Sequence, residues 1–329
     1  YDPQINEIQV NSYNQVYIIR DLKTEQTDIH FEDDEHIRNI IQRMVMHDRG
    51  VSLNESNSTI ESMRRDGTRI TATCPPVSEN TTLVLRKQLV KILTLEDLIR
   101  SKTLDEKTWN LLTKLVKGRA NILLSGGVGS GKTSLMRTLF SITHPKARTL
   151  VLENDRELFL HKHFPERNII EFEEHPEAGA SLSTLFRTLL RYSPNIIIVG
   201  EFRGAGEARE AIRACERGHH GSMATAHFSS PKEAIEGTGR LLLEEGLNIP
   251  ASAATLMVAG AYNVVIQMFG DTTRGIIKVD SVTEVDIESD EVVYRDLIKW
   301  VPETGDYTTG DWVVKNQPGP RLTERLGQY

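Results

Sequence analysis

In the first part of the chain, hydrophobic and polar positions alternate with two different periodicities. The stretch NEIQVNSYNQVYII (residues 6–19) has two short apolar runs around a polar turn, which predicts a β-hairpin. The stretch DDEHIRNIIQRMV (residues 33–45) begins with acids and spaces its apolar side chains three and four residues apart, which predicts a capped amphipathic helix. The apolar face of that helix consists of Ile37, Ile40, Ile41, Met44 and Val45.

Two further segments before residue 93 favour strands. RRDGTRITATC (residues 64–74) contains an Asp66-Gly67 pair, which is typical of a turn between strands, and TTLVLRKQ (residues 81–88) is typical of a strand. Together with the hairpin and the helix, these segments predict a small N-terminal α/β domain built on an antiparallel sheet. We expect this domain to span residues 1–93.

From residue 94 the pattern becomes helical, and short apolar strands then alternate with helices. This alternation is typical of a mostly parallel sheet flanked by helices, so the second domain, residues 94–329, is expected to be an α/β core. One stretch, residues 251–270, is long and apolar enough to suggest a membrane span. Polar residues interrupt it, so we predict a buried helix followed by a buried strand and no transmembrane segment. The interrupting residues are Ser252, Thr255, Asn263 and Gln267.

Composition and charge narrow the class of protein. A length of 329 residues suits about two domains, and 39% hydrophobic with 26% charged residues is typical of a folded globular chain. The net charge is −7, and residues 271–311 hold 11 acidic and 4 basic residues, which argues against stable nucleic-acid binding. The two cysteines, Cys74 and Cys215, indicate neither a disulfide framework nor a zinc finger and fit a reducing cytoplasm.

The segment GGVGSGKT (residues 126–133) gives the clearest indication of a binding site in the sequence. It lies between the apolar NILLS and the helical SLMRTLF, and it matches the P-loop pattern GxxxxGK[ST] in full. Its glycines let backbone N–H groups turn toward an anion at a helix N-terminus, with Lys132 reaching the β- and γ-phosphates and Thr133 holding Mg²⁺. The alternative is a glycine-rich turn that binds nothing. The expected nucleotide-binding residues are Gly127, Val128, Gly129, Ser130, Gly131, Lys132, Thr133 and Ser134.

Acidic residues follow two apolar strands downstream of the P-loop. NIIIVGEFRG (residues 195–204) places Glu201 at the carboxyl end of a strand, where phosphate sites lie in α/β sheets. A carboxylate there could hold a metal-bound water or polarise the attacking one. TLVLENDREL (residues 149–158) repeats the arrangement and makes Glu153 a second candidate general base. The alternative for both glutamates is an acid in a solvated loop without a catalytic role. This alternative is stronger for Glu153, because the charged and amide groups of ENDRE could all simply be solvated.

Three histidines are close together in the sequence GHHGSMATAHF (residues 218–228). His219, His220 and His227 suggest zinc, but a fourth ligand and the usual metal-binding spacing are missing. A sensor of the γ-phosphate is the favoured functional interpretation, and a structural histidine in the core is an equally good one for His220.

Taken in order, GGVGSGKT, LENDREL, LLRYSPNIIIVGEFRG and GHHGSMATAHFSSP resemble the type II/IV secretion and pilus ATPases, and within them the CpaF/TadA tight-adherence pilus ATPases. The resemblance extends over nearly the whole chain through NEIQVN, DGTRI, LVLRK and RLTERLGQY. It implies a RecA-like P-loop core behind a small N-terminal domain, assembled as a homohexamer. It further implies Mg²⁺-dependent ATP hydrolysis that drives filament assembly through an integral membrane platform protein, in a cytoplasmic enzyme peripheral at the inner face of the membrane.

The resemblance also assigns roles to individual residues. Glu201 becomes the Walker B acid that helps to hold Mg²⁺, Glu153 the catalytic glutamate, and His227 the histidine near the γ-phosphate. Arg69 and Arg86, on strands of the N-terminal domain, become arginines that reach the nucleotide in their own or a neighbouring subunit. Judged from the residues alone, both arginines are ordinary surface charges.

Three departures from the family pattern indicate a divergent branch. Asn154 stands where an acid usually follows the catalytic glutamate, and His220 stands where an acid is frequent. The arginine expected before the Asp66-Gly67 turn is replaced, which leaves Arg64 or Arg65 as substitutes.

Two other functions fit the same core. One is a conjugation-type ATPase that supports DNA transfer, which the acidic residues 271–311 disfavour, and the other is a scaffold that binds ATP and hardly turns it over. ATPase rates with and without single-stranded DNA distinguish these possibilities from a secretion motor.

Overall fold

The computed structural model describes residues 2, 4–20, 23–46, 52–64, 67–87, 92–202, 206–244, 246 and 248–328. By their contacts the residues group into two compact units. The first comprises residues 1–90 with 272–275, and the second comprises residues 91–271 with 276–329. Each unit has its own β-sheet.

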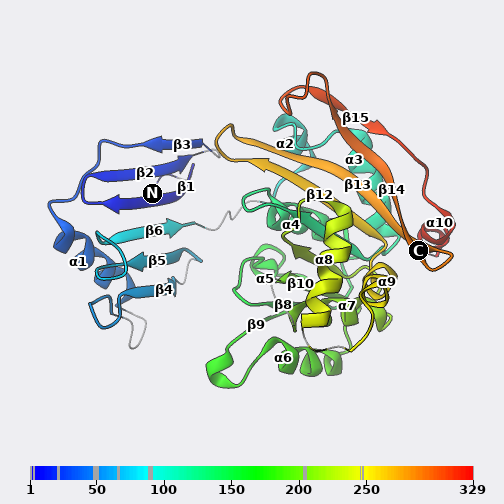
Figure 1. Ribbon diagram of the computed structural model, residues 1–329, viewed down its shortest axis with the longest axis horizontal. Coiled ribbons are helices and arrows are strands. Elements are labelled where there is room, and N and C mark those ends of the chain that lie inside the picture. Colours follow the sequence, from blue (N-terminus) through cyan, green and yellow to red (C-terminus); the bar gives the residue numbers. More distant parts are fainter. Residues whose placement is uncertain are drawn as a thin grey trace. The chain divides into compact units, whose positions relative to one another are not determined.

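The described strands of the first unit form a six-stranded antiparallel sheet in the order β3-β2-β1-β6-β5-β4 (Figure 1). The hairpin expected over residues 6–19 joins β1 to β2, with Val10 opposite Val16. The predicted antiparallel sheet is therefore confirmed. Its strands are β1 (Ile5–Ser12), β2 (Gln15–Arg20), β3 (Lys23–Gln26), β4 (Thr59–Met63), β5 (Arg69–Thr73) and β6 (Thr82–Arg86).

Helix α1 (Asp34–Val45) packs against this sheet. Ile37, Ile41 and Val45 are buried in one core with apolar side chains of β1 and β5, as the spacing of its apolar residues predicts. The helix begins where it does because the Asp33 carboxylate accepts a hydrogen bond from the N–H of His36 at 2.8 Å.

The turn expected at Asp66-Gly67 is described only in part, because Arg65 and Asp66 lie outside the described residues. Gly67 has a φ of 88°, which favours glycine, and its N–H donates to the carbonyl of Arg64 at 2.8 Å. This bond lies between β4 and β5, which pair with Met63 opposite Arg69.

The described part of the second unit contains a nine-stranded sheet in the order β15-β14-β13-β12-β7-β11-β10-β8-β9. Neighbouring strands run parallel from β12 to β9 and antiparallel from β12 to β15, which confirms the mostly parallel core. The strands are β7 (Ile122–Gly126), β8 (Thr149–Glu153), β9 (Ile169–Glu173), β10 (Ile196–Phe202), β11 (Met223–Ala226), β12 (Val264–Asp271), β13 (Ile276–Glu288), β14 (Glu291–Pro302) and β15 (Gly310–Val314).

Helices cover both faces of the parallel strands (Figure 1). On β7, Ile122 and Leu124 pack with α3 and α4, whereas Leu123 packs on the other face with α6, α7, α8 and α9. Burial on both faces explains why these strands are continuous apolar runs. The helices are α2 (Leu95–Arg100), α3 (Glu106–Lys117), α4 (Lys132–Ile142), α5 (Leu160–His163), α6 (Leu182–Leu189), α7 (Glu207–Glu216), α8 (Pro231–Glu244), α9 (Ala251–Ala261) and α10 (Pro320–Gly327), with short 3-10 turns at Pro176–Ala178 and Leu190–Tyr192.

The apolar stretch 251–270 forms helix α9 followed by strand β12, as the sequence predicts. Val258 in the helix and Val264 in the strand are fully buried. Among the described residues, no helix has the length and apolarity needed to cross a membrane.

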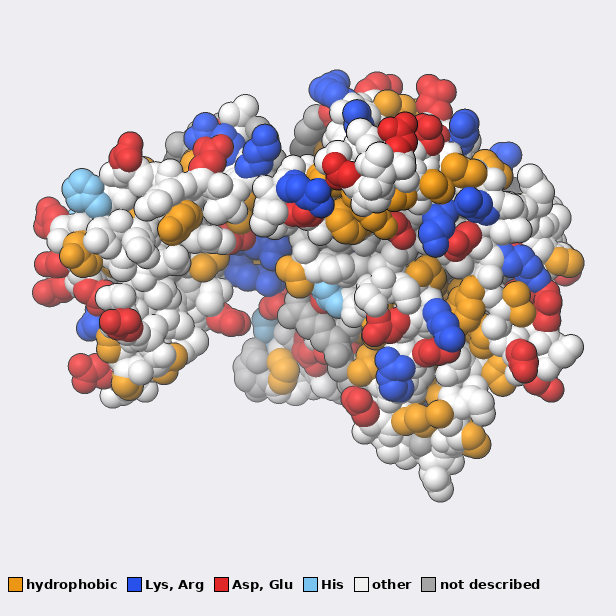
Figure 2. All heavy atoms as spheres, turned by 45° about the horizontal axis from the view of Figure 1, so that its top comes forward, with side chains coloured by type: hydrophobic (Ala, Val, Ile, Leu, Met, Phe, Trp, Pro, Cys, Tyr) orange, Lys and Arg blue, Asp and Glu red, His pale blue; other side chains and the backbone are white. Residues whose placement is uncertain are grey.

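Part of the acidic excess in residues 271–311 is neutralised inside the fold. Glu284 and Asp286 of β13 are buried, and the Arg295 guanidinium lies 3.6 Å and 3.2 Å from their carboxylates. Glu284 also accepts the N–H of Gly319 at 2.8 Å. On the face shown in Figure 2, Lys and Arg side chains are interspersed with Asp and Glu side chains. The acidic count alone is therefore a weaker argument against nucleic acid than the sequence suggests.

Candidate functional site

The P-loop joins the end of β7 to the start of α4. The strand ends at Gly126 and the helix begins at Lys132, which is the strand–loop–helix context that the motif requires. Gly129 and Gly131 have φ angles of 72° and 87°, where a side chain is strained. A Cβ on Gly131 would also lie 3.1 Å from Ile277. The shape of the loop therefore depends on its glycines.

The rest of the loop leads into the N-terminus of helix α4. The Ser130 hydroxyl donates to the Gly127 carbonyl at 2.8 Å, and Val128 is 77% exposed. Thr133 and Ser134 lie in the first turn of α4. The N-terminus of a helix carries partial positive charge and unpaired donors, so this segment suits the phosphates of a nucleotide.

The Lys132 ammonium is held by the loop itself. The residue is 6% exposed, and Nζ donates to the carbonyls of Gly126 at 2.8 Å and Gly127 at 2.9 Å. Nζ also lies 3.3 Å from Nδ1 of His227. A phosphate group that binds here must therefore replace carbonyl contacts of the lysine with its own oxygens.

His227 connects Lys132 to Glu201. Its Nδ1 faces the lysine, which has only donors, so the ring proton is assigned to Nε2, and Nε2 lies 2.6 Å from Oε1 of Glu201. The three residues come from neighbouring strands, since Lys132 follows β7, His227 follows β11 and Glu201 lies near the end of β10. The structure thus brings together three of the residues singled out in the sequence.

Glu153 lies at the end of β8 and is 2% exposed. Its Oε1 accepts the backbone N–H groups of Glu157 and Leu158, both at 3.0 Å, whereas Oε2 has no hydrogen-bond partner among the described residues. Burial raises the pKa of this carboxyl from 4.5 to about 8, although the two N–H groups oppose the rise. Gly200 makes room for it, because a Cβ there would lie 2.6 Å from Cγ of Glu153.

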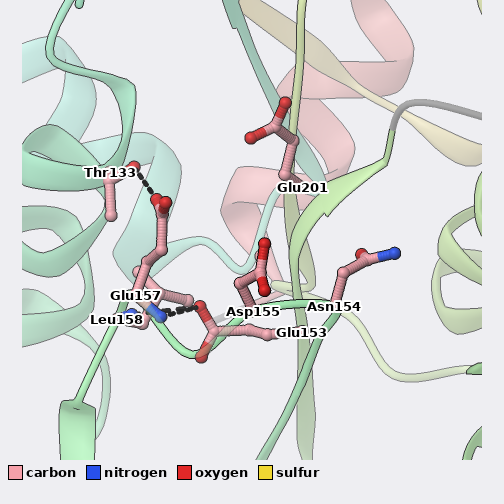
Figure 3. A pocket seen from close by; sticks show the side chains of 8 residues that line it. Thr133, Glu153, Asn154, Asp155, Glu157, Leu158 and Glu201 are labelled. Atoms are coloured by element: carbon pink, nitrogen blue, oxygen red, sulfur yellow. Dashed lines mark hydrogen bonds between the residues drawn. The ribbon is translucent and has the colours of Figure 1, made fainter. Parts of the chain in front are cut away.

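A pocket lies beside Thr133 (Figure 3). The side chains of Asp155 and Glu157 extend toward the space between Thr133 and Glu201. Sequence reasoning singled out only Glu153 in this acidic box, although the alternation of acids in ENDRE was a signal for the other two. The pocket is lined by Thr133, Glu153, Asn154, Asp155, Glu157, Leu158, Gly200 and Glu201.

The donors around this pocket fit Mg²⁺. Thr133 Oγ1 lies 3.5 Å from Oε2 of Glu157, and Asp155 and Glu201 add further carboxylate oxygens. Hydroxyl and carboxylate oxygens are the ligands that Mg²⁺ prefers. The described residues hold no preformed group of three acidic, histidine or cysteine ligands, so most of the coordination would come from water and phosphate, as is usual for Mg²⁺.

The three histidines of GHHGSMATAHF do not lie together in the fold. His219 and His220 precede β11, and His227 follows it, so the strand separates them to opposite ends of the sheet. His219 Nδ1 lies 3.0 Å from the carbonyl of Pro194, just before β10 begins, and burial lowers the pKa of both His219 and His220. Of the three, His227 is the one that contacts Lys132 and Glu201.

Arg69 and Arg86 belong to the first unit and lie directly opposite each other on β5 and β6. Opposite residues share a face of the sheet, and this face is the one away from α1, because the neighbouring Ile70 and Leu85 point into the core. Glu7 of β1 lies opposite Arg86 in turn. Two adjacent guanidinium groups suit an anion, and their contact with a nucleotide stays a prediction.

A family model described as "Type II/IV secretion system protein" matches residues 1–273. The chain is 30% identical over 243 residues to the uncharacterised protein MJ0781 of Methanocaldococcus jannaschii, which covers 68% of this chain and 32% of that one. It is 27% identical over 306 residues to the type IV secretion system protein VirB11 of Brucella suis, which covers 83% of each chain. The chain thus spans about a third of the Methanocaldococcus protein.

Among solved structures, the fold is similar to that of the ATPase DotB of Legionella pneumophila. The TM-score is 0.62 at 15% identity, over 99% of this chain and 80% of that one. At this identity the likeness concerns the fold alone, and it agrees with a sheet-rich N-terminal domain in front of an α/β core. Because the family model covers most of the sequence, the chain belongs to the type II/IV secretion system protein family.

Proposed function

We propose that this protein hydrolyses ATP to power a type II/IV secretion or pilus-assembly system. The observation that carries the proposal is the complete P-loop whose Lys132 lies against His227, which in turn lies 2.6 Å from Glu201. A P-loop lysine, and an acid that can help to hold the metal ion, are recurring parts of phosphoryl-transfer sites. The motifs quoted above favour the CpaF/TadA branch of the family, and this finer placement is part of the proposal.

In the proposed reaction, backbone N–H groups of residues 127–133 bind the phosphates. Lys132 exchanges its contacts with the carbonyls of Gly126 and Gly127 for phosphate oxygens and neutralises their charge. Thr133, Glu157 and Glu201 would hold Mg²⁺, which supplies further charge neutralisation when bound. His227 fixes the orientation of the Glu201 carboxylate through Nε2.

Glu153 needs a change in its surroundings before it can accept a proton from water. With a pKa of about 8, its carboxyl is mostly protonated at neutral pH in the structure described above. A cation that binds nearby favours the ionised form and lowers the pKa. We therefore propose that Glu153 becomes a base only once the nucleotide and its metal occupy the pocket.

The assembly and location are proposed from the resemblance. The protein would act as a homohexamer in the cytoplasm, at the inner face of the membrane, on an integral membrane platform protein. Arg69 and Arg86 would neutralise charge on the nucleotide, and the paired register of these two residues supports such a role.

The test is the rate of ATP hydrolysis with Mg²⁺ for the wild type and for Lys132→Ala. We expect turnover by the wild type and a loss of at least about a thousandfold in the variant, since charge stabilisation at the transferring phosphoryl group is worth about 10³–10⁵ in rate. Equal rates in two folded proteins would refute the site. Single-stranded DNA is added in a parallel series, and strong stimulation would favour DNA transfer over secretion.

A further inference from the structure

We propose that Asn154 is a positioning residue that ties the acidic box of β8 to the start of helix α7. The inference rests on the proposed ATPase function and concerns the position at which the family resemblance leads one to expect an acid. The Nδ2 atom of Asn154 donates to Oε1 of Glu207 at 2.6 Å and to Oε2 of Glu174 at 3.2 Å. All three side chains are half-buried.

The two carboxylates belong to segments that follow different strands. Glu174 follows β9, its N–H donates to the carbonyl of Glu153 at 2.9 Å, and its Oε1 accepts the N–H of Leu182 at the start of α6. Glu207 is the first residue of α7, the helix that follows β10 and therefore Glu201. A single amide thus joins the ends of β8 and β9 to the beginning of α7.

The contact requires an amide rather than an acid. The amide nitrogen of asparagine has two N–H donors, and each serves one carboxylate here. An ionised aspartate has the same shape but only acceptors, so it would place a third negative charge against Glu174 and Glu207. Partial burial weakens screening by water and salt, which makes this repulsion more costly than at an exposed site. An asparagine at position 154, rather than the acid of the family pattern, therefore suits the neighbouring carboxylates of Glu174 and Glu207.

Asn154 acts on the site through the backbone. Figure 3 shows the side chains of Glu153 and Asn154 leaving the end of β8 in different directions, with Glu153 directed toward Leu158 and the Asn154 amide directed away from it. The amide lines the same pocket as Glu153 and Glu201 and ties the end of β8 to the start of α7. Small displacements of catalytic groups cost about a hundredfold in rate, so loss of the contact should lower kcat more than it weakens ATP binding.

The experiment compares Asn154→Asp with two double variants of equal net charge. Asn154→Asp restores the acid of the family pattern. We nevertheless expect it to lower kcat by about tenfold or more, while KM for ATP stays within about twofold of the wild-type value. Adding Glu207→Gln supplies an amide that donates to the new aspartate and should restore kcat to within about threefold. Adding Glu216→Gln instead, at the exposed last turn of α7, should restore nothing.

Thermal unfolding of the same four proteins separates this inference from the proposed function. A wild type that does not hydrolyse ATP would overturn the proposed function. Even then, a lower temperature of half-unfolding in Asn154→Asp, restored by Glu207→Gln and not by Glu216→Gln, would support the contact. If Asn154→Asp does not fold, recovery of the fold by Glu207→Gln alone supports the inference, and failure of both double variants overturns it. The inference is also overturned if Asn154→Asp has the kcat and the unfolding temperature of the wild type. The same holds if Glu207→Gln and Glu216→Gln restore Asn154→Asp equally well.

Discussion

The Nε2 atom of His227 lies 2.6 Å from Oε1 of Glu201, and the opposite ring nitrogen lies 3.3 Å from the ammonium of Lys132. The imidazole therefore joins the P-loop lysine to the acid near the end of β10. When a phosphate draws Lys132 away from its carbonyl partners, the hydrogen bonding of His227 changes as well. In the proposed reaction, the position of Glu201 would therefore depend on whether a phosphate contacts Lys132.

Replacing His227 with alanine should lower kcat by about tenfold to a hundredfold, because a hydrogen bond to a charged group is worth about 1.5–3 kcal/mol. ATP binding should change little, since the P-loop backbone and Lys132 remain. Steady-state rates and the affinity for a non-hydrolysable analogue measure the two effects. His161→Ala, at an exposed position, is the control and should keep wild-type kcat. Lost analogue binding with normal turnover at saturation would contradict this role.

The parts of the site that a local motif defines could be predicted from the sequence. GGVGSGKT determines where the strand ends and where the helix begins, so the pattern alone predicts that Lys132 and Thr133 lie at the start of α4. Glu201 follows the same logic, since an apolar run that stops at an acid marks the end of a buried strand.

The other parts depend on contacts between distant segments. His219 and His227 are near in sequence, yet a buried strand of four residues, β11, puts them at opposite ends of the sheet. Sequence pattern does not give side-chain direction either, so it could not show that Glu153 turns toward backbone N–H groups while Glu157 approaches Thr133. The contact of Asn154 with Glu207 joins residues 53 positions apart and follows only from the topology.

Glu153 should make stability fall as pH rises. Its pKa is raised from 4.5 to about 8 in the folded protein, so between these values the unfolded chain has lost a proton that the folded chain keeps. Folding then takes up a proton, and the free energy of unfolding decreases by up to about 1.4 kcal/mol per pH unit before levelling off above pH 8. Glu153→Gln cannot ionise, so its stability relative to the wild type should improve across this interval.

Urea unfolding without nucleotide, from about pH 5 to pH 9, measures this difference. Glu303→Gln, an exposed glutamate, provides the matched control and should give a constant difference. Parallel curves for Glu153→Gln and the wild type would mean that the carboxyl is not held protonated by burial.

Glu157 should matter for the metal rather than for the phosphates. Its carboxylate lies 3.5 Å from the Thr133 hydroxyl, and replacement by glutamine removes one negative charge from the donors around the pocket. We expect the Mg²⁺ concentration for half-maximal ATPase to rise by about tenfold in Glu157→Gln, which is about 1.4 kcal/mol of binding. The same change at the exposed Glu166 should leave the Mg²⁺ titration unaltered. An unchanged titration in Glu157→Gln would remove this residue from the metal site.

Arg86→Ala should keep its fold and lose ATPase activity. Arg86 is exposed and lies between Arg69, whose like charge is unfavourable, and Glu7, whose opposite charge contributes little at an exposed site, so its removal costs the first unit little. If the arginines neutralise charge on the phosphates, however, the rate should fall by about 10³–10⁵. Thermal unfolding measures the effect on the fold, and ATPase rates measure the effect on activity. Full activity of both Arg69→Ala and Arg86→Ala would exclude the arginines from the site.

Mixing experiments should show whether Arg86 acts on a neighbouring subunit. Arg86→Ala keeps the P-loop and Glu201, whereas Glu201→Gln keeps both arginines and should hydrolyse ATP slowly because an amide lacks the negative charge of the acid. If the protein forms the proposed hexamer and the arginine of one subunit completes the site of the next, a mixed ring contains some interfaces with every group present. Two inactive proteins should then regain measurable ATPase when they are co-assembled. Mixed rings verified by mass that show no recovery would mean that Arg86 serves its own subunit, or that hydrolysis requires every site of the ring to be intact.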